Sequence, residues 1–308
     1  TNKSTKINFK MNIIPFEKKY YSIAQEFIQT YEKYSVILSY KLFQKPEWIF
    51  LLSQNQIISS QEQIIGIVSV SRTILHCLPF ARSTTPENIL LQQEFIQTFA
   101  EFLKTKKVEC LNGEAFGSSL ILSALKLNNI LPSTINDYDL MELNIEEFSK
   151  IPLPTLPQNH QIIRCKPQIN PHYKNQLLQL QKEYEIEEVL PPSMPFSELA
   201  CKIRLNNFLQ NQYFIALKTP SDEFVAKAST NAIGKKFIQL GGIYTKKSQR
   251  RKGFSFILIY TILKRILRVK KSAILFVKKS NIPAINLYKS LSFNKISDYI
   301  ISYFVYND

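Results

Sequence analysis

A short stretch between residues 241 and 255 carries the residue types that bind phosphate groups. It reads GGIYTKKSQRRKGFS, so that apolar residues lead into a basic loop and Gly253 precedes a new apolar stretch. The spacing of the apolar residues predicts a strand before the loop and a helix over 255–270 after it. The first turn of such a helix offers backbone N–H groups without intrahelical partners, together with a partial positive charge. The sequence therefore predicts an anion site at this turn, reinforced by the basic side chains of the loop.

The spacing within the loop distinguishes between classes of phosphate site. The loop has neither the GxxxxGK[ST] pattern of nucleoside triphosphatases nor the three-glycine pattern of dinucleotide-binding folds. Read as Arg250-x-x-Gly253-x-Ser255, it resembles the pyrophosphate-binding [QR]-x-x-G-x-[GA] motif of the GNAT acyltransferase superfamily. A serine takes the place of the last small residue of that motif.

A second segment, about 25 residues further on, strengthens this resemblance. There Asn281, Ala284, Tyr288 and Phe293 stand in the pattern N-x-x-A-x-x-x-Y-x-x-x-x-F, which is similar to the second cofactor segment of the superfamily. Ser292 occupies the position where glycine is usual. The two motifs occur in the family's order and lie on the elements that apolar periodicity predicts for them.

The resemblance implies an acyltransferase domain over residues 161–308 that uses acetyl-CoA as its cosubstrate. The strand before the loop would pair with the pantetheine arm, and the first helical turn would hold the pyrophosphate. The thioester carbonyl would face a strand amide near Ile243, which stabilises the oxygen charge that develops when an amine attacks. The cofactor-binding residues implied in this way are Ile243, Tyr244, Thr245, Arg250, Arg251, Lys252, Gly253, Phe254, Ser255, Asn281 and Ala284.

The resemblance also implies that Tyr288 is the acid that protonates the departing CoA thiolate. A phenol has an ordinary pKa near 10 and a thiol one of about 8.5, so that complete proton transfer is uphill. A hydrogen bond from the phenol that strengthens as charge develops on sulfur serves the same purpose. The competing interpretation is that Tyr288 is a helix residue that only lines the cofactor groove.

The group that removes the proton from the attacking amine is not evident in the sequence. Gln239 stands where several members of the superfamily carry a glutamate, and an amide side chain cannot accept this proton. A chain of water molecules is one alternative. The others are carboxylates beside the loop 190–195, a region that borders the acceptor in this family. These carboxylates are Glu187, Glu188 and Glu198.

The histidines and cysteines predict no metal site. His76 and Cys77 have no second pair at metal-ligand spacing. The four cysteines, at positions 77, 110, 165 and 201, are too few and too widely spread for a disulfide framework in a chain of 308 residues. We therefore expect all four to be reduced, small apolar side chains.

The positive charge of the chain is concentrated around the first motif. The sequence has 39 Lys and Arg against 24 Asp and Glu, and 14 of the basic residues lie between Lys235 and Lys279, where no acidic residue occurs. Such a window is typical of a polyanionic partner, either a nucleic acid or a phosphorylated small molecule. A solvated, lysine-rich helix face is the simpler explanation.

Strands and helices are expected to alternate along the chain. Three prolines in residues 151–160 predict a linker between domains 1–150 and 161–308. Segments 22–35 and 41–52 have a helical or mixed pattern. Strands are predicted at 64–70, 73–78, 108–111, 138–143, 213–218, 224–230, 236–245, 273–277 and 299–306. Helices are predicted at 90–104, 115–127, 174–188, 196–209, 255–270 and 283–290.

Both halves end in the order strand, helix, strand, helix, strand. The predicted class is α/β, with mixed (α+β) sheets and two domains. By fold analogy, the first half is a GNAT-like domain that has lost its cofactor site. Its segment Asn112–Gly117 also lies between a strand and a helix, but Glu114 would repel a phosphate group.

Together these observations favour an enzyme that transfers acetyl from acetyl-CoA to a primary amine by direct attack. Two alternatives stay open: an RNA-associated acyltransferase that uses the basic window, with nucleic acid the less favoured partner, and an acyl-CoA sensor without activity. The sequence does not identify the amine. The longest uncharged apolar stretch, 253–263, is about half a membrane span, and residues 1–12 lack the apolar core of a signal peptide. We therefore expect a cytoplasmic protein without a membrane partner.

Overall fold

The computed structural model describes residues 10–306 except 55–57, 59, 61–62 and 192–193. Its chain forms two compact units. Unit 1 comprises Thr1–Leu140 and Ser297–Asp308, and unit 2 comprises Met141–Ile296. Residues 151–160, all of them described, contain neither helix nor strand and belong to unit 2.

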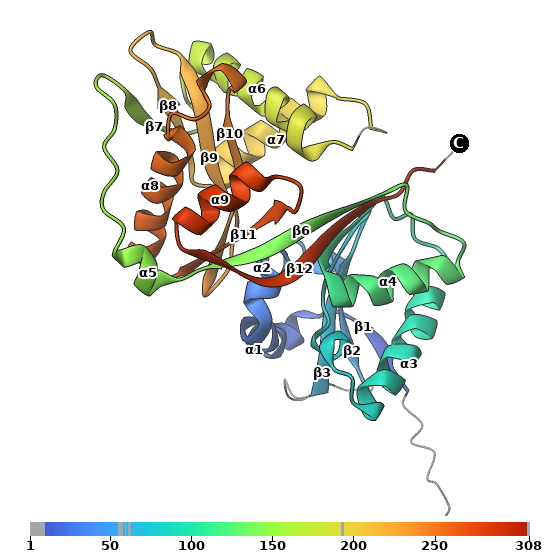
Figure 1. The fold of residues 1–308 in the computed structure, drawn as a ribbon. Coiled ribbons are helices and arrows are strands. Elements are labelled where there is room, and N and C mark those ends of the chain that lie inside the picture. Colours follow the sequence, from blue (N-terminus) through green and yellow to red (C-terminus); the bar gives the residue numbers. More distant parts are fainter. Residues whose placement is uncertain (1–9, 55–57, 59, 61–62, 192–193, 307–308) are drawn as a thin grey trace, which may run out of the picture. The chain divides into compact units, whose positions relative to one another are not determined.

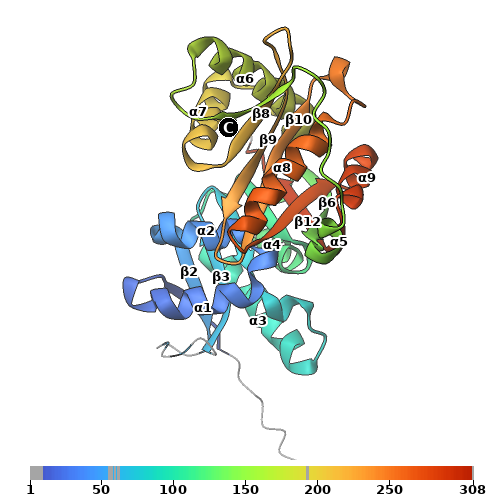
Figure 2. The ribbon, with the colours of Figure 1, turned by 90° about the vertical axis from the view of Figure 1, so that its left-hand side faces the viewer.

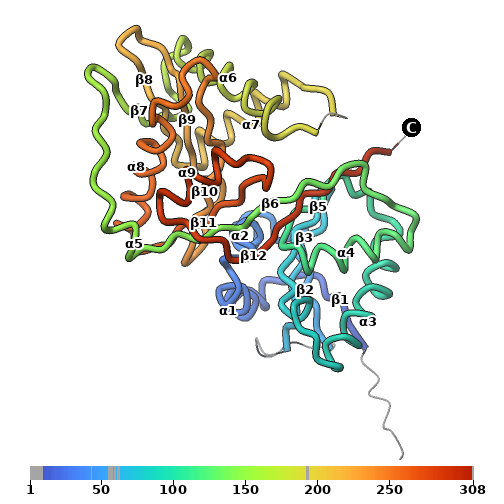
Figure 3. Tube along the Cα trace, in the orientation of Figure 1, coloured from blue at the N-terminus to red at the C-terminus, as the bar shows by residue number. Residues whose placement is uncertain are grey.

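Two long strands, β6 (Thr134–Leu143) and β12 (Phe293–Tyr303), contribute residues to both units. They are neighbours in the sheet and can be followed side by side in the chain trace (Figure 3). The last strand of the chain thereby joins the sheet of unit 1, where it pairs antiparallel with β5 from Tyr299↔Glu114 to Tyr303↔Cys110.

Unit 1 is a mixed sheet with helices on both faces. Its strands follow the order β1-β2-β3-β4-β5-β12-β6. The other elements are β1 (Asn12–Pro15), α1 (Tyr21–Tyr31), α2 (Val36–Gln44), β2 (Ile49–Ser53), β3 (Ile64–Val70), β4 (Thr73–Cys77), a 3-10 turn (Pro79–Arg82), α3 (Pro86–Leu103), β5 (Cys110–Glu114) and α4 (Ala115–Leu127).

The two faces of this sheet have separate apolar cores. On one face Phe27 and Ile28 of α1 pack with Ile67 of β3. On the other face Phe95 of α3 and Ile121 of α4 pack with further strand residues. Successive residues of a strand point to opposite faces, which is why a single strand supplies both cores. In Figure 1, α1 and α2 accordingly lie across the strands from α3 and α4.

Unit 2 repeats this plan. Its strands follow the order β12-β6-β11-β10-β9-β8-β7. Its elements are α5 (Ile145–Ser149), β7 (Gln161–Cys165), α6 (Pro171–Tyr184), a π-helical segment (Glu185–Val189), α7 (Glu198–Asn211), β8 (Phe214–Lys218), β9 (Phe224–Ile233), β10 (Phe237–Thr245), a 3-10 turn (Lys247–Gln249), α8 (Phe254–Arg268), β11 (Ser272–Lys278) and α9 (Ile282–Ser290).

Helix α8 shows why the sequence folds in this way locally. Apolar residues recur every fourth position at Phe254, Leu258, Ile262 and Ile266, and all four are buried in one core cluster. This stripe packs α8 against the sheet of unit 2. Figure 2 shows α8 lying against the strands of that unit. Helices α6 and α7 pack in a separate cluster that includes Phe214 and is the core of the opposite face.

Most predicted elements are confirmed within a few residues, and strand 64–70 and helix 115–127 match their observed bounds. The short strands β1, β2 and β7, of four or five residues each, were not predicted. The last strand begins at Phe293, six residues before its predicted start at 299.

No helix in the described part of the chain is both long enough and apolar enough to cross a membrane.

Candidate functional site

The strand that leads into the basic loop separates from its parallel neighbour along its length. Among the described residues of the two strands, β10 pairs with β11 through residues 237–239 and 272–274, although both strands continue beyond that point. Ile243, Tyr244 and Thr245, which the resemblance places beside the pantetheine arm, follow this divergence. The edge of β10 that faces the gap can accept an extended ligand as an added strand.

The loop leaves the start of α8 open. Gly253 has a φ of +76°, and the helix begins there without a side-chain cap. The first intrahelical bond runs from the N–H of Ile257 to the Gly253 carbonyl, so the N–H groups of Phe254, Ser255 and Phe256 have no intrahelical acceptor. A Cβ at Gly253 would meet nothing within 4 Å. The helix start therefore has donors and space for an anion.

The arginine of the first motif is held in an ion pair. Arg250 donates through Nη2 to Oε1 of Glu187 at 2.7 Å and through Nε to the Thr245 carbonyl at 3.1 Å. It therefore ties the loop to the segment 185–189. In the described part of the chain, Arg251 and Lys252 form no ion pair with an acidic residue, and both are exposed beside the helix start.

Phe254 and Ser255, also in the first motif, can bind an anion through their backbone N–H groups but not through their side chains. Oγ of Ser255 lies 2.8 Å from Oγ1 of Thr245, which holds the serine hydroxyl against the end of β10. The side chain of Phe254 is buried, and its ring centroid lies 5.5 Å from that of His160. The N–H groups of residues 254 and 255 are thus the parts that can meet a phosphate.

The second motif forms the start of α9. Asn281 caps the helix, because its Oδ1 accepts from the N–H of Ala284 at 3.1 Å. Its Nδ2 donates to both carboxylate oxygens of Glu188 at 3.3 Å. After the helix, Ser292 has a φ of +66°, which explains why glycine is the usual residue at this position.

Tyr288 lies on α9 with its ring buried and 7% of its surface exposed. The ring meets Phe293 edge-on, with centroids 6.1 Å apart. Its hydroxyl has no hydrogen-bond partner among the residues that the structure describes. Burial raises the pKa of Tyr288, and the nearby Tyr184 and Glu188 raise it further. The phenol therefore stays protonated at neutral pH. It can donate a hydrogen bond to a bound ligand.

The three carboxylates considered as bases lie in different surroundings. Glu187 is occupied by Arg250 and accepts a hydrogen bond from Tyr244 at 3.2 Å. Glu198 pairs with Lys202 at 2.6 Å on an exposed face of α7. Glu188 contacts the cap of α9 and has no ion pair with any described residue. Of the three, Glu188 is thus both near the second motif and able to accept a proton.

Gln239, at the position where several members of the superfamily carry a glutamate, is buried, with 3% of its surface exposed. Its Nε2 is buried without a hydrogen-bond acceptor in the described chain. The loop 190–195, which the resemblance places at the acceptor, is described only in part, because Pro192 and Ser193 lie outside the described residues.

The basic window, continuous in sequence, forms two groups in space. The window runs along β10, returns along α8 and then follows β11, which is parallel to β10. Its basic residues therefore gather at the two opposite ends of these elements. The group beside the loop and the start of α9 contains Lys246, Lys247, Arg250, Arg251, Lys252, Lys278 and Lys279. The group at the other end contains Lys235, Lys236, Lys264, Arg265, Arg268, Lys270 and Lys271.

In unit 1, the helix start that corresponds to the uncapped start of α8 is capped. Its strands β4 and β5 also pair in parallel for three residues, so the loop 78–85 between β4 and α3 is the counterpart of the basic loop. Here Thr85 caps the helix by accepting from the N–H of Asn88, and Pro86 at the first position has no N–H to offer. Glu87 adds a negative charge to the first turn.

Asn112–Gly117 is therefore not the counterpart of the basic loop. That segment joins β5 to α4, and its topological counterpart in unit 2 is the connection from β11 to α9. Glu114 itself caps α4 by accepting from the N–H of Gly117 at 3.4 Å. That unit 1 lacks a phosphate site stays a prediction, and Pro86, the cap at Thr85 and Glu87 argue for it in place of Glu114.

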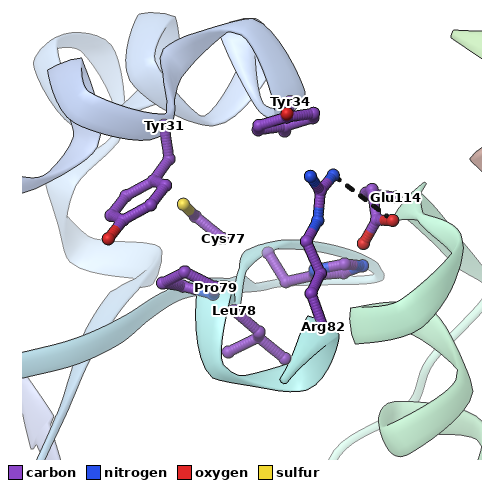
Figure 4. Close-up of a pocket in the computed structure, with 8 residues that line it drawn as sticks. Tyr31, Tyr34, Cys77, Leu78, Pro79, Arg82 and Glu114 are labelled. Carbon is purple, nitrogen blue, oxygen red and sulfur yellow. Dashed lines mark ion pairs between the residues drawn. The ribbon is translucent and has the colours of Figure 1, made fainter. Parts of the chain in front are cut away.

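Where β4 and β5 diverge, unit 1 has a pocket of about 210 Å³ (Figure 4). His76 fills the gap between the strands, since a Cβ at Gly113 would lie 2.1 Å from its Nε2. Burial lowers the pKa of His76 to about 3 and raises that of Cys77 to about 12, so both are neutral. The lining residues are Tyr31, Tyr34, His76, Cys77, Leu78, Pro79, Arg82 and Glu114.

The charged residues of this pocket neutralise each other. Arg82 lies 3.3 Å from the Glu114 carboxylate and 3.5 Å above the centroid of the Tyr34 ring. The pocket therefore presents no excess positive charge to a pyrophosphate. Among the described residues of the whole chain, no three His, Cys, Asp or Glu side chains are grouped as metal ligands.

The fold and the site together define the class. Each unit has a mixed sheet in which the fourth and fifth strands diverge, and the arrangement is the GNAT fold in tandem. In the C-terminal part of the chain, residues 222–302 match the family model described as FR47-like protein. The predicted fold class and the predicted family resemblance are both confirmed.

Solved structures share this fold over nearly the full chain. A Drosophila melanogaster protein has a TM-score of 0.64 at 10% identity and covers 94% of this chain and 98% of its own. A tandem GNAT protein from the clavulanic acid biosynthesis pathway has a TM-score of 0.58 at 10% identity, covering 95% and 98%. A GCN5-related N-acetyltransferase from Sphaerobacter thermophilus has 0.53 at 12%, covering 95% and 94%. No curated protein matches the sequence.

One buried charge at the site was missed by the sequence analysis. Lys227 interrupts the apolar start of β9, in the sequence FVAKASTNAI, and is the one charged residue of that strand. Its side chain is completely buried. The sequence feature that could have predicted this residue is a lysine between apolar strand residues, because lysine is almost never fully buried unless it is paired.

Proposed function

We propose that unit 2 is an acyl-CoA-dependent N-acyltransferase that transfers acetyl from acetyl-CoA to a primary amine by direct attack. The observation that carries this proposal is the uncapped start of α8, placed where β10 leaves β11. It supplies N–H donors without intrahelical acceptors, open space, and two cations that form no ion pair among the described residues. The GNAT fold supports the same activity, and one neighbour in fold is an N-acetyltransferase.

The bound thioester would supply an activated acyl group, and the residues of unit 2 would hold it in place. The N–H groups at 254–256 would bind the pyrophosphate, with Arg251 and Lys252 beside them. Ile243, Tyr244 and Thr245 would pair with the pantetheine arm. Asn281 is already oriented by its cap, and Ala284 is small enough to leave room for that arm.

Proton transfer would involve one donor and one acceptor near α9. Tyr288 would donate a hydrogen bond to the thiolate as negative charge develops on sulfur. Because burial keeps its pKa above the ordinary value, this residue is available as a donor over the whole neutral range. Glu188 would accept the amine proton in place of Gln239, directly or through one water molecule.

We expect Glu188→Gln to lower kcat by about 100-fold, the range seen when a general base is lost. Glutamine keeps an oxygen that can accept from Nδ2 of Asn281, so binding of acetyl-CoA should be nearly unchanged. The rate of CoA release with saturating acetyl-CoA and amine measures the effect. Glu198→Gln is the matched control, because that carboxylate pairs with Lys202 on an exposed face. Equal rates for both variants would assign the base role to water.

We expect each chain to bind one CoA, although the fold occurs twice. Pro86 and the cap at Thr85 remove the donors at the start of α3, whereas the start of α8 keeps them. Calorimetric titration of the full chain gives the stoichiometry directly. Two sites per chain would show that unit 1 has kept a cofactor site, and no heat at millimolar CoA would contradict the proposed function.

Acyl transfer is tested with a panel of primary amines. Release of CoA that depends on one class of amine supports the enzyme, whereas tight binding of acetyl-CoA with no transfer to any amine would favour a sensor. We propose the cytoplasm as its location, in keeping with four free cysteines, as expected in a reducing compartment.

A further inference from the structure

Lys227 is a fully buried lysine that has one hydrogen-bond partner among the residues that the structure describes. Its Nζ donates to the carbonyl of Gly242 at 2.8 Å. Aromatic rings surround the rest of the ammonium group, with the centroid of Tyr184 at 4.2 Å and that of Phe214 at 5.7 Å. Burying a lysine is costly unless it is hydrogen-bonded or paired. Among the described residues, the atom that accepts a hydrogen bond from this ammonium group is therefore a backbone oxygen of β10.

That oxygen belongs to a β-bulge in the strand that would bind the thioester. The register between β9 and β10 shifts between Gly241, which opposes Ser229, and Tyr244, which opposes Lys227. Two residues of β10 thus oppose one of β9. Gly242 has a φ of +63°, a conformation that other residues rarely adopt. The bulge turns the peptide between residues 242 and 243 out of the regular ladder.

The direction of this peptide connects Lys227 with the reaction. A peptide group is planar and trans, so the N–H of Ile243 points away from the carbonyl of Gly242. Lys227 holds the carbonyl, and the N–H is therefore directed to the side opposite the lysine. A cation bonded to the oxygen of an amide also polarises that amide and makes its N–H a stronger donor.

We propose that Lys227 positions and polarises the Gly242–Ile243 peptide, so that the N–H of Ile243 stabilises the negative charge on the thioester oxygen. This inference rests on the proposed function. Lys227 is a positioning residue, because it acts through the peptide and does not contact the substrate. A fixed donor directed at developing charge is worth far more in a dry site than in water.

The groups around Lys227 determine its charge. Glu185 of the π-helical segment and Cys201 of α7 face it, together with Tyr184 of α6. Glu185 is held by Arg204 through a hydrogen bond of 2.8 Å from Nε. Burial lowers the pKa of Lys227 to about 7, against the attraction of Glu185. The ammonium form, which polarises the peptide more strongly, is therefore lost as the pH rises through neutrality.

The test compares two substitutions on the same bulge. Lys227→Met keeps the volume of the side chain and removes the donor to Gly242. Ser229→Ala removes the bond from Oγ of Ser229 to the Gly241 carbonyl, 3.1 Å long, which belongs to the preceding peptide. Deleting an oxyanion donor costs about 100- to 1,000-fold in kcat, and weakening one costs less. We expect Lys227→Met to lower kcat by about 10- to 100-fold, Ser229→Ala to leave it nearly unchanged, and both to bind acetyl-CoA like the native protein.

Infrared spectroscopy of bound acetyl-CoA, labelled with ¹³C at the thioester carbonyl, measures the polarisation of that carbonyl. It therefore distinguishes a loss of polarisation from a general disturbance of the fold. The carbonyl stretch should lie at higher frequency in Lys227→Met than in the native protein or Ser229→Ala. If Lys227→Met and the native protein have equal frequencies and equal kcat, this inference is overturned, whereas the proposed function is not affected. An equal loss of kcat in Ser229→Ala would also overturn it. If the native protein neither binds nor transfers, the proposed function itself fails, and this inference with it.

If Lys227→Met does not fold, the pH dependence of the carbonyl stretch in the native protein tests the role of Lys227. Between about pH 6 and about pH 9 the carbonyl stretch of bound acetyl-CoA should move to higher frequency, because Lys227 loses its proton in this range. The same change is expected in Ser229→Ala. A frequency that does not vary with pH would overturn the inference.

Discussion

Replacing Tyr288 with phenylalanine is expected to lower kcat by about 100- to 1,000-fold while the Kd for acetyl-CoA stays nearly unchanged. The substitution removes only the hydroxyl, which has no partner in the described chain and whose loss leaves the ring packed on Phe293. Because burial keeps the pKa of this phenol above 10, the native protein should show no loss of activity from its ionisation at neutral pH. Steady-state kinetics and calorimetry provide the two readouts.

Tyr260→Phe is the matched control for this prediction. Tyr260 is also buried in the core of unit 2, but it lies on α8 and donates to the Ile151 carbonyl at 3.3 Å. Loss of that single bond should lower the free energy of unfolding by about 1 kcal/mol and leave kcat unchanged. If Tyr288→Phe has the kinetics of the native protein, the residue only lines the groove.

Gly253→Ala is expected to weaken CoA binding by about tenfold, the equivalent of 1.4 kcal/mol. The new methyl group would stand in the open space before α8, where the phosphate approaches. At a φ of +76° it also costs about 1–2 kcal/mol of folding free energy. Pantetheine, which lacks the pyrophosphate, should bind the variant and the native protein equally. Calorimetry with both ligands measures the difference.

Asn129→Ala separates backbone strain from the loss of the anion site. Asn129 follows α4 in unit 1 and has a φ of +59°, so an alanine there meets a similar conformational penalty. Chemical denaturation should show destabilisation in both variants, whereas only Gly253→Ala should lose affinity for CoA. A parallel loss of pantetheine affinity in Gly253→Ala would show that the helix start does not act on the phosphates.

Elements with a strong apolar pattern were predicted from sequence because local spacing decides them. Helix α8 repeats an apolar residue every fourth position, and β3 is a run of apolar residues bounded by polar ones. Strands β1 and β7 have four or five residues and no such pattern. Their strand conformation depends on pairing with β2 and β8, a long-range contact that no local window contains.

The candidate site was predicted in part for the same reason. Motifs confined to one loop and one helix start, such as Arg250 to Ser255, depend on neighbours in sequence and can be read directly. The pairing of Arg250 with Glu187 joins residues that lie 63 positions apart, so no local window of the sequence could predict it. The role of Arg250 in binding phosphate stays a prediction.

The order of residues thus determined, without further help, where α8 begins, that Gly253 precedes its first turn, and which tyrosine follows on α9. Tertiary structure decided which charges face that turn, which carboxylate lies beside Asn281, and that Lys227 is buried against the carbonyl of Gly242. The reason is physical: backbone donors at a helix end arise from local geometry. The strength and partner of a side-chain charge depend instead on which strands and helices exclude water from it.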